Sequence, residues 1–385
     1  MKRYLLAVLF FDFCALLYGI STLSISYNEA QIYFYDHSLI AMIARFGTTL
    51  FGQNDFGLRL PFVLLHSLSC ILLYILALKY TKTSFDAFIS VVLFILLPGS
   101  VASALLINES SIMIFFTLLI LVLFEYKKIF LFYVLLVLVL FVDGNFAILY
   151  LSFFFFAIYK KDKLLIICSL ILFAIAMSVY GFDASGKPKG YFLDTLGIFA
   201  ACFSPLIFLY FFYVVYRILL QDDKPLLWFI SASTFVFCLI FSIRQRLFLE
   251  DFLPFCVVCT PLLIRYLMSS YRSRMPQLRL KHKIFIECSL IFLLFFYLGI
   301  IFNQSFYYLL KDPKKHFAYD YHIAKELALN LKQHNLTHIA IQDKELALRL
   351  KFYGISKGKL ELYSSKKASK IYVSLGKHKV YYSIK

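Results

Sequence analysis

Long apolar segments alternate with short polar ones along most of the chain. About 11 of them follow one another up to residue 303, and several reach the roughly 20 residues that a helix needs to cross a bilayer. We expect helices at about 4–22, 60–79, 86–106, 112–126, 129–142, 145–159, 164–181, 193–218, 226–243, 252–269 and 284–303. The pattern predicts a polytopic α-helical membrane protein.

The pattern changes after about residue 303. Ile323, Leu327 and Leu331 recur every fourth residue, which places them on one face of a helix. A second helix is predicted between Asp343, a suitable N-cap, and Gly354, a suitable terminator. Short alternating segments predict strands at 338–341, 359–363 and 370–373. We therefore expect a membrane domain over 1–303 and a small α/β domain over 304–385.

Composition and charge agree with this class. Apolar residues make up 62% of the chain and charged residues 16%, whereas a soluble protein carries about 25% charged residues. The net charge of +17 is concentrated in alternate short loops, which argues against a nucleic-acid partner and follows the positive-inside pattern. The N-terminus is then cytoplasmic, and an odd number of spans places residues 304–385 outside the cytoplasm.

The 8 cysteines lie within predicted spans. Cys256 and Cys259 form a C-x-x-C spacing, but the spacing falls inside an apolar segment. We interpret the cysteines as small hydrophobic residues rather than disulfide partners or metal ligands.

The first extracytoplasmic loop, about 22–59, is long and polar. It gathers Asn28, Glu29, Asp36 and His37, and its segment 39–44 has the composition of a helix lying in the membrane interface. Such groups can perform chemistry on a membrane-borne substrate. They can equally be solvated residues at the end of a helix, and the residues alone leave both readings open.

Three phrases in this loop resemble a known family. They are Tyr-Asn-Glu-Ala at 27–30, Asp-His-Ser-Leu at 36–39 and Leu-Phe-Gly-Gln-Asn-Asp-Phe-Gly-Leu-Arg-Leu-Pro at 50–61. The order is similar to the N-terminal half of glycosyltransferase family 39, which has GT-C architecture and includes protein O-mannosyltransferases and the aminoarabinose transferases of lipid A. The resemblance covers about residues 1–160.

The resemblance implies the transfer of a sugar from a polyprenyl-phosphate donor, without a nucleotide. The family's first acidic residue, its proposed catalytic carboxylate, falls on Asn28 in this chain, and an amide cannot accept a proton as a carboxylate does. Either Glu29 or Asp36 then acts as the base, or catalysis has been lost. Ser38 replaces the first proline of the family's second motif.

Several other residues are candidates for substrate binding. A guanidinium binds phosphate through paired N–H donors, and an interfacial anchor is the alternative role for such arginines. Glu109 lies at the predicted extracytoplasmic end of a helix, where it either contacts substrate or caps the helix in solvent. Residues 143–145 are predicted to form a tight turn. The substrate-binding candidates are His37, Arg59, Glu109, Arg244 and Arg246, with Lys187 and Lys189 as weaker phosphate ligands.

The sequence thus predicts a membrane glycosyltransferase of the bacterial inner membrane, with a periplasmic C-terminal domain. Its acceptor would be lipid A, a glycan or a protein. The alternative, favoured by Asn28, is a non-catalytic GT-C-like protein that binds or translocates lipid-linked glycans. No cofactor is assigned, and a divalent ion at Glu29 and His37 stays open because two ligands do not define a metal site.

Overall fold

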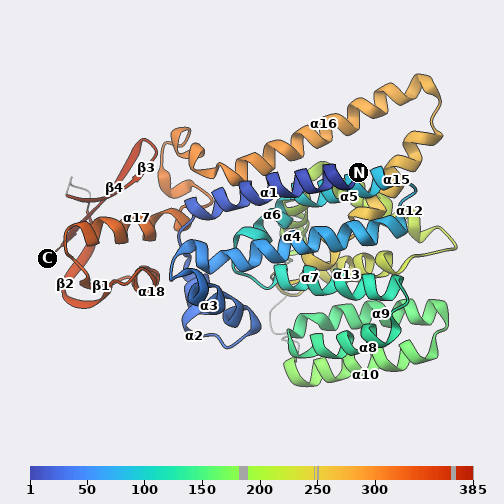
Figure 1. Ribbon diagram of the computed structural model, residues 1–385, viewed down its shortest axis with the longest axis horizontal. Coiled ribbons are helices and arrows are strands. Elements are labelled where there is room, and N and C mark those ends of the chain that lie inside the picture. Colours follow the sequence, from blue (N-terminus) through green and yellow to red (C-terminus); the bar gives the residue numbers. More distant parts are fainter. Residues whose placement is uncertain (182–189, 247, 249–250, 366–369, 385) are drawn as a thin grey trace. The chain divides into compact units, whose positions relative to one another are not determined.

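The computed structural model describes residues 1–181, 190–246, 248, 251–365 and 370–384 (Figure 1). These residues form two compact units. The helical unit comprises 1–12, 64–104 and 108–297, and the C-terminal unit comprises 13–63, 105–107 and 298–385. Helices α1 (Lys2–Thr22) and α4 (Asp55–Tyr80) each begin in one unit and end in the other. Contacts therefore group the first loop with residues 304–385, so the units do not coincide with the division predicted at 303/304.

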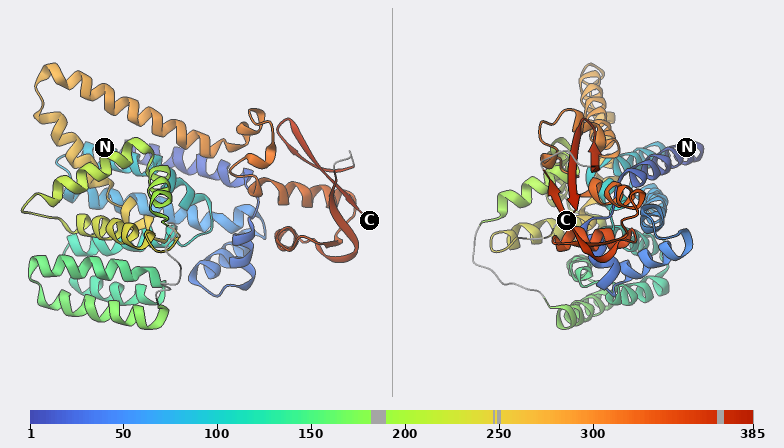
Figure 2. Two further views of the ribbon diagram at one scale, coloured as in Figure 1. Left: turned by 180° about the vertical axis from the view of Figure 1, so that it is seen from behind. Right: turned by 90° about the vertical axis from the view of Figure 1, so that its left-hand side faces the viewer.

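The described part of the helical unit consists mostly of apolar helices (Figures 1 and 2). Helix α9 packs against both α10 and α13, and α5 packs against α15. Besides parts of α1 and α4, the unit contains α5 (Ser84–Leu96), α6 (Pro98–Leu105), α7 (Ser110–Glu125), α8 (Ile129–Leu138), α9 (Ala147–Lys160), α10 (Lys163–Tyr180), α11 (Phe192–Phe203), α12 (Pro205–Leu219), α13 (Leu226–Ser242), α14 (Leu253–Val257), α15 (Thr260–Ser273) and α16 (Pro276–Ile301), of which α6 and α16 end in the other unit.

Two segments predicted to be single helices are each broken in the middle. The segment 86–106 bends by 64° between α5 and α6, and the segment 193–218 bends by 106° between α11 and α12. A proline begins the second helix of each pair, and the residue before a proline is driven out of the helical conformation. Leu97 is accordingly extended, with ψ of 127°, and Ser204 has a φ of 66°.

The two breaks lie against one another within the helical unit. A Cβ added to Gly99, just after the first break, would lie 3.1 Å from the Cβ of Cys202, just before the second break. A larger residue at position 99 would force its neighbours to shift by a few tenths of an ångström, so glycine favours this close approach between the two broken segments.

The predicted apolar segments are helical, but the predicted number of spans is not confirmed. Among the described residues, 5 helices are long and apolar enough to cross a membrane, or up to 7 if each bent pair is one span. Four of the expected segments form shorter apolar helices, at 110–125, 129–141, 144–160 and 226–242. An apolar segment of 10–17 residues does not by itself span about 30 Å of hydrocarbon.

The C-terminal unit contains a small mixed sheet next to helices from both ends of the chain. The sheet order is β1-β2-β4-β3, with β1 and β2 parallel and the other pairs antiparallel. Strand β4 was not predicted, whereas the other three strands and the two helices after residue 303 were predicted. The elements are α2 (Tyr27–Tyr35), α3 (Leu39–Phe51), α17 (Asp320–Gln333), β1 (His338–Ile341), α18 (Lys344–Phe352), β2 (Ser356–Ser365), β3 (Ile371–Leu375) and β4 (His378–Ile384).

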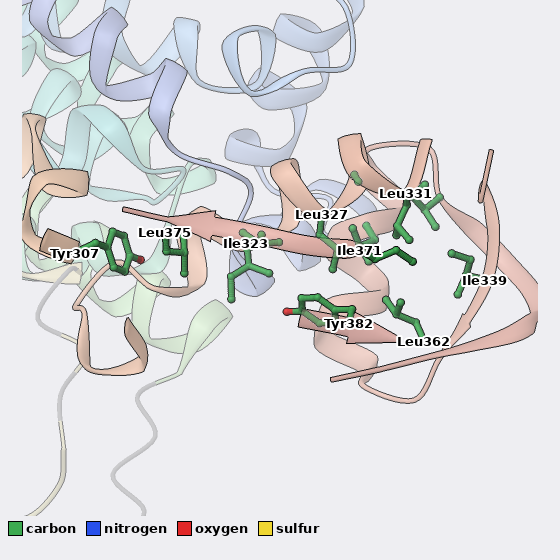
Figure 3. Packing of buried hydrophobic residues seen from close by; sticks show 13 residues of the cluster. Tyr307, Ile323, Leu327, Leu331, Ile339, Leu362, Ile371, Leu375 and Tyr382 are labelled. Atoms are coloured by element: carbon green, nitrogen blue, oxygen red, sulfur yellow. The ribbon is translucent and has the colours of Figure 1, made fainter. Parts of the chain in front are cut away.

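The core of the sheet is formed by the faces that the sequence pattern predicts (Figure 3). Ile323, Leu327 and Leu331 of α17 are buried in it. Helix α18 begins where expected, because the Asp343 carboxylate accepts the N–H of Glu345 at 2.9 Å. The four-stranded sheet has one helix before β1 and one after it. It shares its unit with residues 13–63, so a separate domain over 304–385 stays a prediction.

Candidate functional site

Glu29 is a buried anchor of the first loop. It stands at the third position of α2 and forms a capping box with Ser26, whose N–H donates to Glu29 Oε2 at 2.8 Å. Arg59 donates to Glu29 Oε2 at 2.6 Å and to Oε1 at 3.1 Å, and the N–H of Ile107 donates to Oε1 at 3.1 Å. Each carboxylate oxygen accepts two hydrogen bonds, so no lone pair is left for an acceptor proton.

Arg59 is equally occupied, so the structure does not support it as a phosphate ligand. Its side chain is fully buried. Beyond the bonds to Glu29, its Nη1 donates to the carbonyl of Leu23 and its Nη2 to the carbonyl of Ser24, both at 2.9 Å. Its remaining N–H faces Asp55 at 3.9 Å. The guanidinium holds the end of α1 to α2 rather than presenting donors to a ligand.

Asp55 extends this network toward the C-terminal sheet. Its Oδ2 lies 3.2 Å from Nζ of Lys325, and its Oδ1 accepts the hydroxyl of Tyr353. The Tyr353 oxygen in turn accepts the N–H of Ile25 at 3.0 Å. Burial and the charge of Asp55 raise the pKa of Tyr353 well above its usual value, so the phenol stays protonated and donates.

Sequence reasoning missed Asp55, Lys325 and Tyr353. Asp55 precedes Arg59 by four residues, and this spacing on a helix is a signal for an ion pair that was available from the sequence. The partners Lys325 and Tyr353 are about 300 residues away along the chain, and no local pattern connects them to Asp55.

Asp36 ends α2 and carries the partly exposed carboxylate of the first loop. Its Oδ1 accepts the N–H groups of His37 at 2.7 Å and Ser38 at 3.1 Å, and its Oδ2 accepts the Ser38 hydroxyl. Burial raises the pKa of Asp36, but the bonds from Ser38 and His37 outweigh burial and place the pKa below its ordinary value. Asp36 is therefore ionised at neutral pH. The serine that replaces the family's proline supplies two of these bonds.

Arg45 fixes the backbone on both sides of this turn. Its Nε donates to the carbonyl of Tyr33 at 2.8 Å, and its Nη2 donates to the carbonyl of Asp36. Of the four polar candidates in the first loop, Asn28 and His37 are exposed, Asp36 is partly exposed, and Glu29 is buried.

Glu109 lines a separate cavity in the helical unit. The cavity has a volume of about 420 Å³, and Glu109, Asp143 and Tyr180 all line it. Asn145 Nδ2 lies 3.4 Å from Glu109 Oε2, and its backbone N–H donates to Asp143 Oδ1 at 2.6 Å. The predicted turn at 143–145 is a short 3₁₀ segment, and it brings a second carboxylate beside Glu109, which the sequence did not indicate.

The remaining predicted ligands lie elsewhere. Arg244 and Arg246 are exposed just after α13, in the helical unit, whereas Asp36 belongs to the C-terminal unit. The expectation that they meet one substrate stays a prediction. Lys187 and Lys189 lie outside the described residues.

A buried polar cluster connects three helices of the helical unit. Asp12 Oδ1 accepts the hydroxyl of Tyr297 at 2.8 Å, and its Oδ2 lies 3.3 Å from Nε2 of His66. His66 Nε2 also lies 3.6 Å from Sγ of Cys70. Polar groups of this kind hold apolar helices together and also occur along proton and substrate pathways.

The described residues contain no group of three or more His, Cys, Asp or Glu side chains that could hold a metal ion. Glu29 is saturated and His37 is exposed, so the pair considered for a divalent ion is not supported as a site. All eight cysteines are free.

Comparison with known proteins identifies the fold. No protein-family model matches the chain, and no curated protein matches it in sequence. The chain is similar in structure to ArnT of Cupriavidus metallidurans, an aminoarabinose transferase of GT-C family 39. The ArnT crystal structure with bound undecaprenyl phosphate has a TM-score of 0.60 and 10% identity, over 93% of this chain and 85% of that chain. The crystal structure of ArnT in the apo state has a TM-score of 0.58 and 10% identity, over 93% of this chain and 86% of that chain. The chain therefore has the ArnT fold, as its first-loop phrases predicted.

Proposed function

We propose that the protein is a membrane glycosyltransferase that moves a sugar from a polyprenyl-phosphate donor to an acceptor outside the cytoplasm. The observation that carries the proposal is the shared fold with ArnT over 93% of the chain, since that neighbour binds undecaprenyl phosphate. The first loop adds support, because its buried anchor holds a separate, ionised carboxylate at the surface.

Asp36 is the proposed general base. The acceptor oxygen attacks the anomeric carbon, the bond from that carbon to the lipid phosphate breaks, and its electron pair leaves with the phosphate. The acceptor proton passes to Asp36, which is ionised at neutral pH because Ser38 and His37 donate to it. His37 is exposed next to it, and Asn28 is exposed at the opposite end of α2. Both are proposed to bind sugar hydroxyls.

Arg244 and Arg246 are the proposed phosphate ligands. Both are exposed, whereas Arg59 has its donors in use. A guanidinium stabilises the charge that develops on the departing lipid phosphate, and it remains charged at any physiological pH. Glu109 is proposed to bind substrate in the cavity that Asp143 also lines.

A second candidate is a protein that binds or translocates lipid-linked glycans without catalysis. The buried Asp12, His66 and Tyr297 cluster favours it, because ionisable groups inside membrane helices often mark a transport pathway. The exposed amide at Asn28, where the family has a carboxylate, points the same way.

One experiment separates the two. The protein in nanodiscs is incubated with radiolabelled sugar on undecaprenyl phosphate and with extracts of cell-envelope acceptors, and the products are analysed by mass spectrometry. Sugar on an acceptor together with free undecaprenyl phosphate supports the transferase. Donor binding without any product, in a folded preparation, supports the binding or translocation protein.

A further inference from the structure

A groove in the C-terminal unit is not used by the proposed catalytic groups. It has a volume of about 790 Å³, within the range of small-ligand sites. One wall is helix α2, and the other is formed by β1, α18 and the start of β2. The groove thus joins the catalytic loop to the C-terminal domain inside a single unit.

The α2 wall is built from one regular face. Tyr27, Gln31 and Tyr35 recur every fourth residue, so they lie in a row along the helix. Gln31 Nε2 donates to the Tyr27 hydroxyl at 2.8 Å, which orients the amide along the wall. The row ends beside Asp36, the proposed base.

The opposite wall is basic. Lys344, Lys351 and Lys357 line it, and none of the described residues that line the groove is acidic. Three positive charges in one concavity reinforce each other's potential and attract anions. The Nζ of Lys351 also lies 4.5 Å from the ring centroid of Phe34, so its ammonium group packs against α2.

A local irregularity in the sheet accounts for Lys357. His338 pairs with Ser356, but the next residue, Ile339, pairs with Leu360, so residues 357–359 bulge out of strand β2. The bulge requires Gly358, because a Cβ there would lie 2.1 Å from the His338 carbonyl oxygen. Of the two lysines in the bulge, Lys357 lines the groove and Lys359 does not.

We infer that this groove binds the acceptor and that the acceptor is an anionic glycan, with its acidic groups on the lysines and its hydroxyls on the tyrosine and glutamine side chains of α2. The identification of the ligand as the acceptor rests on the proposed function. The binding site itself is argued from the groove alone. Lysine supplies ammonium donors to phosphate or carboxylate, while Tyr27, Gln31 and Ser356 hydrogen-bond neutral polar groups. An acidic peptide would use the lysines and leave most of the hydroxyl-binding wall unused.

The test is a binding titration of the full chain in nanodiscs. The probes are a phosphorylated disaccharide, a disaccharide containing a uronic acid, the neutral parent disaccharide, inorganic phosphate and a glutamate-rich peptide of equal charge. We expect one or both anionic sugars to bind at least about tenfold more tightly than the neutral sugar, inorganic phosphate or the peptide, because a charge-assisted bond adds to the hydroxyl contacts. The preferred sugar identifies whether phosphate or carboxylate is recognised.

The variant Lys344→Gln/Lys357→Gln should weaken the binding of the anionic sugar at least about tenfold and that of the neutral sugar little. Lys359→Gln is the matched control, since it removes the same charge from the same bulge without changing the groove, and it should bind like the native chain. Equal losses in both variants, tighter binding of the peptide, or no binding of any sugar by folded protein would each overturn the inference. Undecaprenyl phosphate binding is measured on the same samples. If the protein does not bind undecaprenyl phosphate but binds the sugar, the proposed function is contradicted and the assignment of the groove is supported.

Discussion

Arg59 Nη2 lies 2.6 Å from Glu29 Oε2, and neither side chain is accessible to solvent. This pair closes the first loop at its base, because Glu29 lies in the first turn of α2 and Arg59 lies in the first turns of α4. The loop between them can then carry exposed chemistry on a fixed support.

Glu29→Gln is expected to destabilise the protein. The substitution leaves the buried Arg59 guanidinium without its counter-charge, and breaking one side of a buried pair costs about 3–5 kcal/mol. Thermal unfolding in detergent measures the effect. Glu287→Gln is the control, because Glu287 forms an exposed pair with Lys283 at 3.5 Å, and its loss should cost less than about 1 kcal/mol. A fully stable Glu29→Gln protein without activity would instead make Glu29 the base.

Asp36→Asn should leave the fold intact and reduce transfer. The amide keeps an oxygen for the N–H groups of His37 and Ser38, but it cannot accept the acceptor proton, so we expect a loss of about a hundredfold to ten-thousandfold. Single-turnover transfer from labelled donor measures it, with thermal unfolding as the control. Full activity would place the base elsewhere. In the companion variant Asn28→Asp, which restores the family's carboxylate, a gain of activity is the sign of a decayed enzyme.

Arg246→Ala should weaken donor binding. Arg246→Lys should recover only part of it, because an ammonium cannot reproduce the two-pronged contact of a guanidinium with phosphate. Undecaprenyl phosphate affinity in nanodiscs measures both variants, and Arg244→Ala tests the neighbouring arginine. Unchanged affinity in a stable Arg246→Ala protein means that Arg246 is an interfacial anchor.

The C-terminal domain is expected outside the cytoplasm. A cysteine at Ser365, in a chain whose native cysteines are replaced by Ala or Ser, should react with a membrane-impermeant thiol reagent in intact spheroplasts. A second cysteine at Lys127, in a predicted cytoplasmic loop, should react only after lysis. The opposite result at Ser365 would reverse the predicted topology of that end of the chain.

Acid should destabilise the C-terminal sheet. Burial and the nearby His316 lower the pKa of His322 from 6.5 to about 4, and His322 Nδ1 lies 2.9 Å from the Tyr307 hydroxyl. The folded state therefore resists protonation while the unfolded chain accepts it, so stability is unaffected above pH 6.5 and falls as the pH drops toward 4. The shift corresponds to about 3 kcal/mol.

Unfolding between pH 7 and 4 measures this loss, and His322→Gln should flatten it. Burial raises the pKa of Glu326, which acts in the opposite sense above about pH 4.5, and the comparison with the variant removes that contribution. An identical pH profile in the variant would show that His322 does not control the acid sensitivity.

More of the secondary structure than of the candidate site could be predicted from the sequence. Apolar periodicity located the helices, and alternation and caps located α17, α18 and three strands, because these signals act over a few residues. The bends escaped prediction, although Pro98 and Pro205 were visible, since a proline in an apolar segment can start a new helix or kink an existing one. Glu29 and Arg59 were predicted to act on the substrate, and the structure gives both side chains buried partners that the sequence did not indicate. A polar segment in a loop suggests a reactive site as long as the hydrogen-bond partners of its side chains are unknown. Here the partners are the N–H of Ile107 and the carbonyls of Leu23 and Ser24, which no local pattern indicates.

The close approach of Gly99 to Cys202 has a consequence for insertion into a membrane. A break in a helix leaves backbone carbonyls without their usual donors, and hydrocarbon does not tolerate such groups unless protein covers them. Because the two interrupted segments meet at their breaks, each shields the other's irregular backbone from lipid. The α5–α6 segment is synthesised about 100 residues before α11–α12, so Gly99 lacks its contact with Cys202 until the later segment arrives. A larger side chain at Gly99 should therefore impair biogenesis, seen as prolonged retention at the insertion machinery, even where the finished protein folds.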